Sequence, residues 1–184
     1  MAQPDQAAAG GKPTSRRRAE FQRHARALLL LEAATSDAHL GCCNRAYLAR
    51  RGREEVARRV RYGHRLSVLV LAADGGADPD EARLKALVAM ARLVLRPTDI
   101  MGRWHAGELV VLLPSTGLAG AGRLARRLSA GFAAEARNSG VPLAASIGIA
   151  TALGRQEGLE LLLLRARAGL EEARLAGGNR VGIG

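Results

Sequence analysis

The sequence predicts an α/β (α+β) domain in which helices flank a mainly antiparallel central sheet, with one further helix in front. Three observations lead to this fold class. Short apolar runs of strand length alternate with longer amphipathic runs of helical length. Two of the apolar runs are separated by only a short turn, which predicts a β-hairpin. A chain of 184 residues is also long enough for one ordinary domain plus a short extension.

The beginning of the chain predicts a tail and a helix. Residues 1–14 are rich in Ala, Gly, Gln and Pro, which predicts a disordered tail. From Ser15 to Ala34, Phe21 and several leucines recur at helical spacing opposite a basic face, so we expect a helix that ends near residue 35. The remaining residues, 36–184, are expected to form the domain.

The first part of the domain predicts a turn, a helix and a buried strand. Asp37 can cap the segment after it, and residues 41–44 have the composition of a tight turn. A helix is expected over residues 45–62. Residues 66–72 (LSVLVLA) form a short run of apolar and β-branched residues between turn signals, which is typical of a buried central strand.

A third helix and a hairpin are expected next. Residues 81–95 have helical periodicity, and Pro97 stops the helix. Residues 100–104 and 108–113 then flank the short turn at residues 105–107, which predicts the β-hairpin.

The last third of the chain predicts two more helices and two more strands in alternation. Pro114 ends the hairpin, and residues 118–137 form an amphipathic pattern that predicts a helix. A strand is expected over residues 144–150, a helix over residues 159–176 and a short final strand over residues 180–183. The resulting order of elements favours a mainly antiparallel sheet.

Composition limits the functional classes. A net charge of +11 makes anionic partners plausible, whereas aromatic residues at only 3% argue against specific nucleic-acid recognition. The two cysteines, Cys42 and Cys43, are adjacent, which disfavours a disulfide. The most apolar run near the N-terminus, residues 27–31, is too short to cross a bilayer, and no signal-peptide cleavage site follows it. We therefore expect a cytoplasmic protein without membrane contact.

Three stretches together resemble the GGDEF (diguanylate cyclase) family. Residues 36–45 (SDAHLGCCNR) are similar to the family's opening D-x-L-T-G-L-x-N-R turn. Residues 146–150 (SIGIA) are similar to its S-I-G-V-A strand, and residues 176–181 (AGGNRV) to its closing A-G-R-N-R-V. The resemblance spans roughly residues 36–181 and implies the GGDEF, nucleotidyl-cyclase-like fold, with residues 15–35 as a signalling or dimerisation helix.

The segment that resembles the family signature departs from it. Residues 103–114 are similar to R-x-G-G-D-E-F followed by an apolar strand and a proline. Only the glutamate of the signature keeps its type here, because the five positions are His105, Ala106, Gly107, Glu108 and Leu109.

The resemblance implies that this domain is degenerate and has no catalytic residues. Active members of the family join two GTP molecules into cyclic di-GMP and need divalent metal held by carboxylates. The two metal-ligand positions here are Ala72 and Gly107, so no metal site and no magnesium cofactor are expected. The guanine-binding segment shrinks to residues 75–80, and the phosphate-binding positions become Arg174 and Gly178.

One family motif is retained. Arg96-Pro97-Thr98-Asp99 matches an R-x-x-D inhibitory site that binds cyclic di-GMP, five residues before the signature, and Arg127 corresponds by spacing to a further arginine of that site. Guanidinium groups can bind phosphate or the guanine edge, and a carboxylate can accept from guanine N–H groups. An arginine at a helix end and an aspartate near a strand start are also ordinary structural features, which leaves the alternative that the motif has no ligand.

The sequence therefore predicts a catalytically inactive cyclic di-GMP receptor that uses Arg96, Asp99 and Arg127. An alternative is a protein-interaction scaffold that needs no nucleotide and docks or dimerises through the helix at residues 15–35. Residual diguanylate cyclase activity is a third alternative. The expected partners are thus cyclic di-GMP and a protein or a second copy of the chain.

Overall fold

The computed structural model describes residues 15–75, 80–140 and 143–184. The chain divides into two units, residues 1–34 and Thr35–Gly184. Helix α1 (Ser15–Thr35) carries an exposed apolar set, with 61–75% of each residue accessible, made up of Phe21, Leu28, Leu29, Leu30 and Leu31. The tail expected over residues 1–14 lies outside the described residues. None of the helices in the described ranges is long and apolar enough to cross a membrane.

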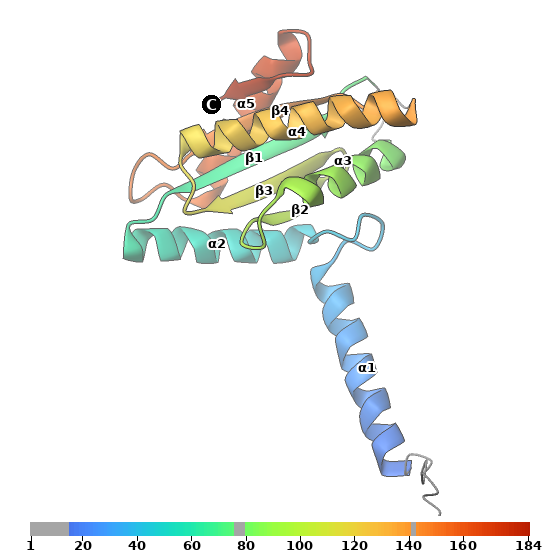
Figure 1. Ribbon diagram of the computed structural model, residues 1–184. Helices are drawn as coiled ribbons and strands as arrows, with labels where there is room; N and C mark the ends of the chain where they lie inside the picture. The colour runs from blue at the N-terminus through green and yellow to red at the C-terminus, as the bar shows by residue number, and fades with distance from the viewer. Residues whose placement is uncertain (1–14, 76–79, 141–142) are drawn as a thin grey trace, which may run out of the picture. The chain divides into compact units, whose positions relative to one another are not determined.

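The second unit contains the central sheet and its helices (Figure 1). Each predicted element is present, and its ends lie within two residues of the prediction. The elements are α2 (Arg45–Tyr62), β1 (Leu66–Ala73), α3 (Glu81–Val94), β2 (Ile100–His105), β3 (Glu108–Pro114), α4 (Leu118–Ser139), β4 (Ala145–Thr151), α5 (Leu159–Leu175) and β5 (Val181–Ile183).

The sheet has the strand order β2-β3-β1-β4-β5. The three pairs β2–β3, β3–β1 and β1–β4 are antiparallel, and only β4–β5 is parallel, which confirms the predicted mainly antiparallel sheet. The register places Ala72 of β1 opposite Glu108 of β3 and opposite Ser146 of β4. This register brings the end of β1 and the hairpin turn to the same end of the sheet.

Both faces of the central strands are covered, which explains why β1 is a continuous apolar run. Leu69 and Leu71 pack into the core under α3 and α4. Their neighbours Val68, Val70 and Ala72 pack into the core under α2 and α5 on the opposite face. A strand that is buried on both faces has no solvent side and therefore no polar alternation.

Local signals fix the ends of two helices next to the site. Asn44 caps α2 by accepting from the Tyr47 N–H at 2.9 Å, and Gly63 ends the helix with a positive φ of 73°. Asp80 caps α3 by accepting from the Ala82 and Arg83 N–H groups. These caps set where α2 begins and ends and where α3 begins.

Close packing of α5 on β4 requires a glycine. A Cβ atom at Gly148 would overlap the backbone of Ala166 and Leu170 on α5. Gly148 is the glycine of the stretch Ser146-Ile147-Gly148 on β4, and its lack of a side chain allows the close contact between α5 and the sheet.

Candidate functional site

The hairpin turn between β2 and β3 carries the five signature positions. His105 pairs with Glu108, so Ala106 and Gly107 form the tight turn between the strands, and a register shift lies between Arg103 and His105. The sheet register puts Ala72 directly opposite Glu108, and Ala72 is fully buried. Ala72, Gly107 and Glu108 therefore lie together at one end of the sheet.

Glu108 on β3 forms an ion pair with an arginine of helix α5. The Arg167 guanidinium on α5 donates to Glu108 Oε1 at 2.9 Å, and the Glu108 side chain is only 12% exposed. Glu108 Oε2 is buried and has no hydrogen-bond partner among the described residues. The carboxylate that keeps its type in the signature is thus held against a cation.

The second carboxylate in this region, Asp74, is occupied by structural hydrogen bonds. The Ser146 hydroxyl donates to Asp74 Oδ1 and Oδ2 at 2.9 and 3.1 Å, and the Asn179 N–H donates to Oδ2 at 2.7 Å. Gly178, which has a φ of 72°, lies against the same carboxylate. Asp74 therefore fastens the turn before β5 to the end of β1.

The donors needed for a divalent cation are not gathered here. Within residues 15–75, 80–140 and 143–184, no group of three or more His, Cys, Asp or Glu side chains is arranged to hold a metal ion. Arg174, which matches a phosphate-binding position by sequence, pairs with Glu171 on its own helix at 3.1 Å. Most of the shortened segment at residues 75–80 lies outside the described residues.

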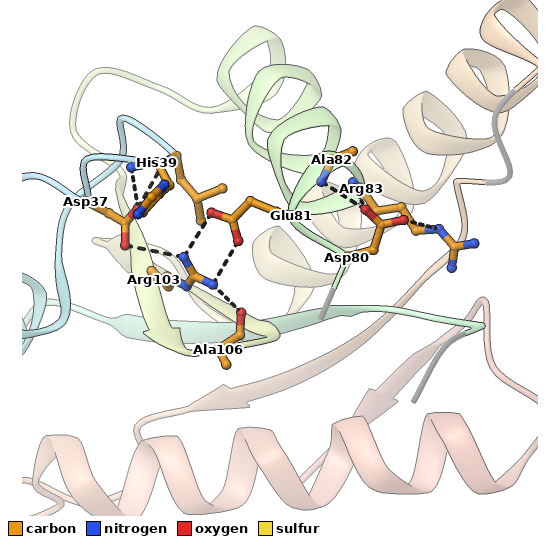
Figure 2. A network of polar contacts seen from close by, with 9 residues as sticks. Asp37, His39, Asp80, Glu81, Ala82, Arg83, Arg103 and Ala106 are labelled. Carbon is orange, nitrogen blue, oxygen red and sulfur yellow. Dashed lines mark hydrogen bonds and ion pairs between the residues drawn. The ribbon is translucent and has the colours of Figure 1, made fainter. Parts of the chain in front are cut away.

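Arg103 on β2 is the centre of a network of polar contacts beside the hairpin turn (Figure 2). The Arg103 guanidinium donates to Glu81 Oε1 and Oε2 at 3.2 and 3.0 Å and to the Ala106 carbonyl at 2.8 Å. It also lies 3.6 Å from Asp37 Oδ2. One arginine therefore joins the start of α3, the turn before α2 and the signature hairpin.

Asp37 is held in its charged form within this network. Burial by itself would raise the pKa of Asp37, but the Leu40 and His39 N–H groups and the charge of Arg103 together hold that pKa below its ordinary value. The two N–H groups donate to Asp37 Oδ1 at 2.9 and 3.0 Å. Asp37 thus closes the turn that the sequence predicted it to cap.

A separate hollow of about 190 Å³ brings the retained R-x-x-D residues together. It lies between the segment after α3 and helix α4, and it is lined by Val94, Arg96, Asp99, Leu113, Thr116, Gly120, Arg123, Leu124 and Arg127. All three residues singled out from the sequence, Arg96, Asp99 and Arg127, therefore border one cavity. Arg96 and Asp99 also form a closed turn, because the Arg96 N–H donates to Asp99 Oδ2 at 2.9 Å and the Asp99 N–H donates to the Arg96 carbonyl at 3.0 Å.

Sequence reasoning missed a fourth charged residue of this cavity. Arg123 lies one helical turn before Arg127 on α4, and both are exposed. Residues separated by four positions share a helix face, so the spacing alone could have identified Arg123. Three guanidinium groups and one carboxylate can thus reach a ligand in this hollow, a combination suited to phosphate and to the guanine edge.

Comparisons with known proteins identify the family of the domain. The family model described as "Diguanylate cyclase, GGDEF domain" matches residues 34–180. Diguanylate cyclase DgcP of Pseudomonas aeruginosa is 33% identical over 163 residues, which cover 83% of this chain and 24% of DgcP. The chain thus spans about a quarter of the length of that curated relative.

Solved structures show the same fold. The diguanylate cyclase SiaD of Pseudomonas aeruginosa, solved in complex with its activator SiaC, is 27% identical with a TM-score of 0.72, covering 92% of this chain and 70% of SiaD. The coiled coil and GGDEF domain of DgcB from Caulobacter crescentus, solved in complex with c-di-GMP, is 18% identical with a TM-score of 0.75, covering 92% of this chain and 96% of that one.

Proposed function

The chain belongs to the GGDEF diguanylate cyclase family, and from that premise we propose that it is a catalytically inactive member that acts as a receptor for cyclic di-GMP. The observation that carries the proposal is the cavity bordered by Arg96, Asp99, Arg123 and Arg127. Its three guanidinium groups would bind phosphate and the guanine O6/N7 edge, and Asp99 would accept from guanine N–H groups.

The size of the cavity determines how the ligand would sit. Its volume of about 190 Å³ is below the roughly 300–1,000 Å³ of pockets that enclose a drug-sized ligand. The cavity would therefore receive one guanine and its phosphate, and the rest of the cyclic dinucleotide would remain at the open side. Arg123 and Arg127 lie on the exposed surface of α4, where they can reach that outer part.

The signature end of the sheet supports the inactive state. Metal-assisted phosphoryl transfer needs carboxylate oxygens at the cation, whereas Ala72 and Gly107 offer none. Glu108 is bound to Arg167, and Asp74 is engaged by Ser146 and Asn179. The residues present therefore do not fit a magnesium ion.

Calorimetric titration with cyclic di-GMP tests the receptor proposal. We expect the protein to bind cyclic di-GMP and the variants Arg96→Ala and Arg123→Ala to lose roughly 10- to 150-fold in affinity, the equivalent of 1.5–3 kcal/mol for a charged hydrogen bond. Arg126→Ala is the matched control, because Arg126 is also exposed on α4 but does not border the cavity. Equal losses in all three variants, or no binding by the wild-type protein, would contradict the proposal.

Inactivity needs its own measurement. The purified protein is incubated with GTP and magnesium, and cyclic di-GMP is measured by chromatography. We expect no product. Formation of cyclic di-GMP would show residual cyclase activity and would contradict the inactive state, whatever the titration shows.

A scaffold that needs no nucleotide is the second candidate function. It is favoured by the four consecutive exposed leucines of α1, Leu28 to Leu31, which form an apolar patch near the end of the helix. In this case α1 would pair with a second copy or with a partner protein. Light scattering of the wild-type protein and of a variant with Leu28 and Leu31 changed to Ser tests the pairing, and an unchanged mass would contradict a dimer through α1.

A further inference from the structure

A groove follows helix α2 on the side that faces the segment between α3 and β2. It consists of two hollows of about 520 and 400 Å³, which share Arg51, Arg96, Pro97 and Ile100 as lining residues and therefore adjoin. The larger hollow includes Tyr47 and Arg92, and the smaller one continues to His64 and Arg65 past the end of the helix. We call the two hollows together the basic groove.

The charge of the basic groove is strongly positive. Its lining contains two carboxylates, Glu55 and Asp99, and six arginines: Arg51, Arg58, Arg59, Arg65, Arg92 and Arg96. Glu55 is buried and already lies 3.1 Å from Arg58 and 3.6 Å from Arg51. Arg65 and Arg96 have no ion pair with any described residue. Arg51 also pairs with Glu54, and Arg59 and Arg92 donate to backbone carbonyls. Arg65 and Arg96 are therefore the arginines whose charge is left for an external anion.

Two of the four aromatic residues of the domain lie on the same helix. Both tyrosines of the chain, Tyr47 and Tyr62, belong to α2, and at 1.5 Å per residue they lie about 22 Å apart along it. An arginine guanidinium lies over each ring, Arg50 at 4.9 Å and Arg61 at 5.3 Å. Tyr62 is 59% exposed, so most of its ring is accessible to solvent. Tyr47 lines the larger hollow, and Tyr62 lies beside His64 of the smaller one, with 5.9 Å between the two ring centroids.

We propose that the basic groove binds single-stranded nucleic acid without sequence specificity. Arginines that track a phosphate backbone, combined with aromatic faces on which unpaired bases stack, are the usual chemistry of such sites. A duplex keeps its bases stacked internally and cannot use the tyrosine faces, and an acidic peptide offers no bases to them. This interaction differs from sequence-specific recognition, and its site shares Arg96 with the proposed cyclic di-GMP cavity.

Fluorescence anisotropy with a labelled single-stranded oligonucleotide of mixed sequence tests the proposal. The double variant Arg65→Gln, Arg96→Gln should bind roughly ten-fold or more weakly at low salt, and its slope of log K against log salt should fall by about 1.4, at 0.7 per lost phosphate contact. Tyr47→Ala should lose roughly 5- to 150-fold, the equivalent of one stacked base.

The controls separate a built site from the overall positive charge. Arg126→Gln, Arg137→Gln removes the same two charges from exposed positions on α4, which packs on the opposite face of the sheet, and should leave binding nearly unchanged. Equal losses in the two double variants would overturn the proposal. Equal affinity for a duplex of the same sequence or for polyglutamate would also overturn it, because those ligands offer no unpaired bases and would bind through charge alone.

Discussion

Arg167 on α5 and Glu108 on β3 form an ion pair of 2.9 Å at the end of the sheet where the signature hairpin turns. Glu108 is 12% exposed and Arg167 is 44% exposed, so the carboxylate is the buried partner. A buried carboxylate needs a cation or several donors, because removal from water penalises its charge. The pair therefore ties α5 to the hairpin.

Removal of this arginine should destabilise the fold. Arg167→Gln leaves Glu108 without its cation, and we expect the free energy of unfolding to fall by about 1–2 kcal/mol. Urea denaturation measures the change. Arg174→Gln is the control, because it breaks the more exposed Arg174–Glu171 pair on the same helix and should cost less than about 0.5 kcal/mol. Similar losses for both variants would contradict a structural role of the Arg167–Glu108 pair.

The Arg103 network should depend on the shape of the guanidinium as well as on its charge. Arg103→Lys keeps the charge, but a lysine cannot donate to both Glu81 oxygens and the Ala106 carbonyl in the same way. We expect a loss of about 1–2 kcal/mol. Hydrogen exchange should also become faster in residues 100–108 than in β4. Unchanged exchange in the hairpin would show that the network does not hold the turn.

Asp37 should give a pH-dependent contribution to stability. Its folded pKa is lowered, so the contribution is full above the unfolded carboxyl pKa near 3.8 and is lost as the pH falls from there through the folded pKa. Asp37→Asn keeps an acceptor for the Leu40 and His39 N–H groups but removes the charge. We expect the difference in unfolding free energy between wild type and variant to be constant at neutral pH and to shrink in acid. A difference in unfolding free energy that stays constant into that acid range would contradict a lowered pKa of Asp37 in the folded protein.

Gly148 should tolerate no side chain. Gly148→Ala would force a methyl group into the backbone of Ala166 and Leu170, so we expect a loss of about 3 kcal/mol or failure to fold. Gly154→Ala is the matched control, because a Cβ there meets nothing within 4 Å. Thermal unfolding of the two variants measures the difference. A stable Gly148→Ala protein would mean that α5 can move away from β4.

Much of the candidate ligand cavity was visible in the sequence because its parts are local. Arg96 and Asp99 belong to one turn, and their reciprocal backbone hydrogen bonds close that turn without help from distant residues. Arg127 was placed by its correspondence, through spacing, to an arginine of the family's site. Its neighbour Arg123 was missed, although its spacing of four residues from Arg127 puts both on one face of α4.

The sequence alone determined where the helices and strands lie and that Ala72 and Gly107 carry no carboxylate. Helical and strand periodicity, glycines and prolines act over a few residues, so the ends of the elements followed from local rules. Ala72 and Gly107 likewise offer no carboxylate in any conformation. Only the tertiary structure decided the contacts of Glu108 with Arg167, of Arg103 with Glu81 and of Asp74 with Asn179. Each joins residues more than twenty positions apart, and such contacts depend on sheet register and helix packing, which periodicity does not specify.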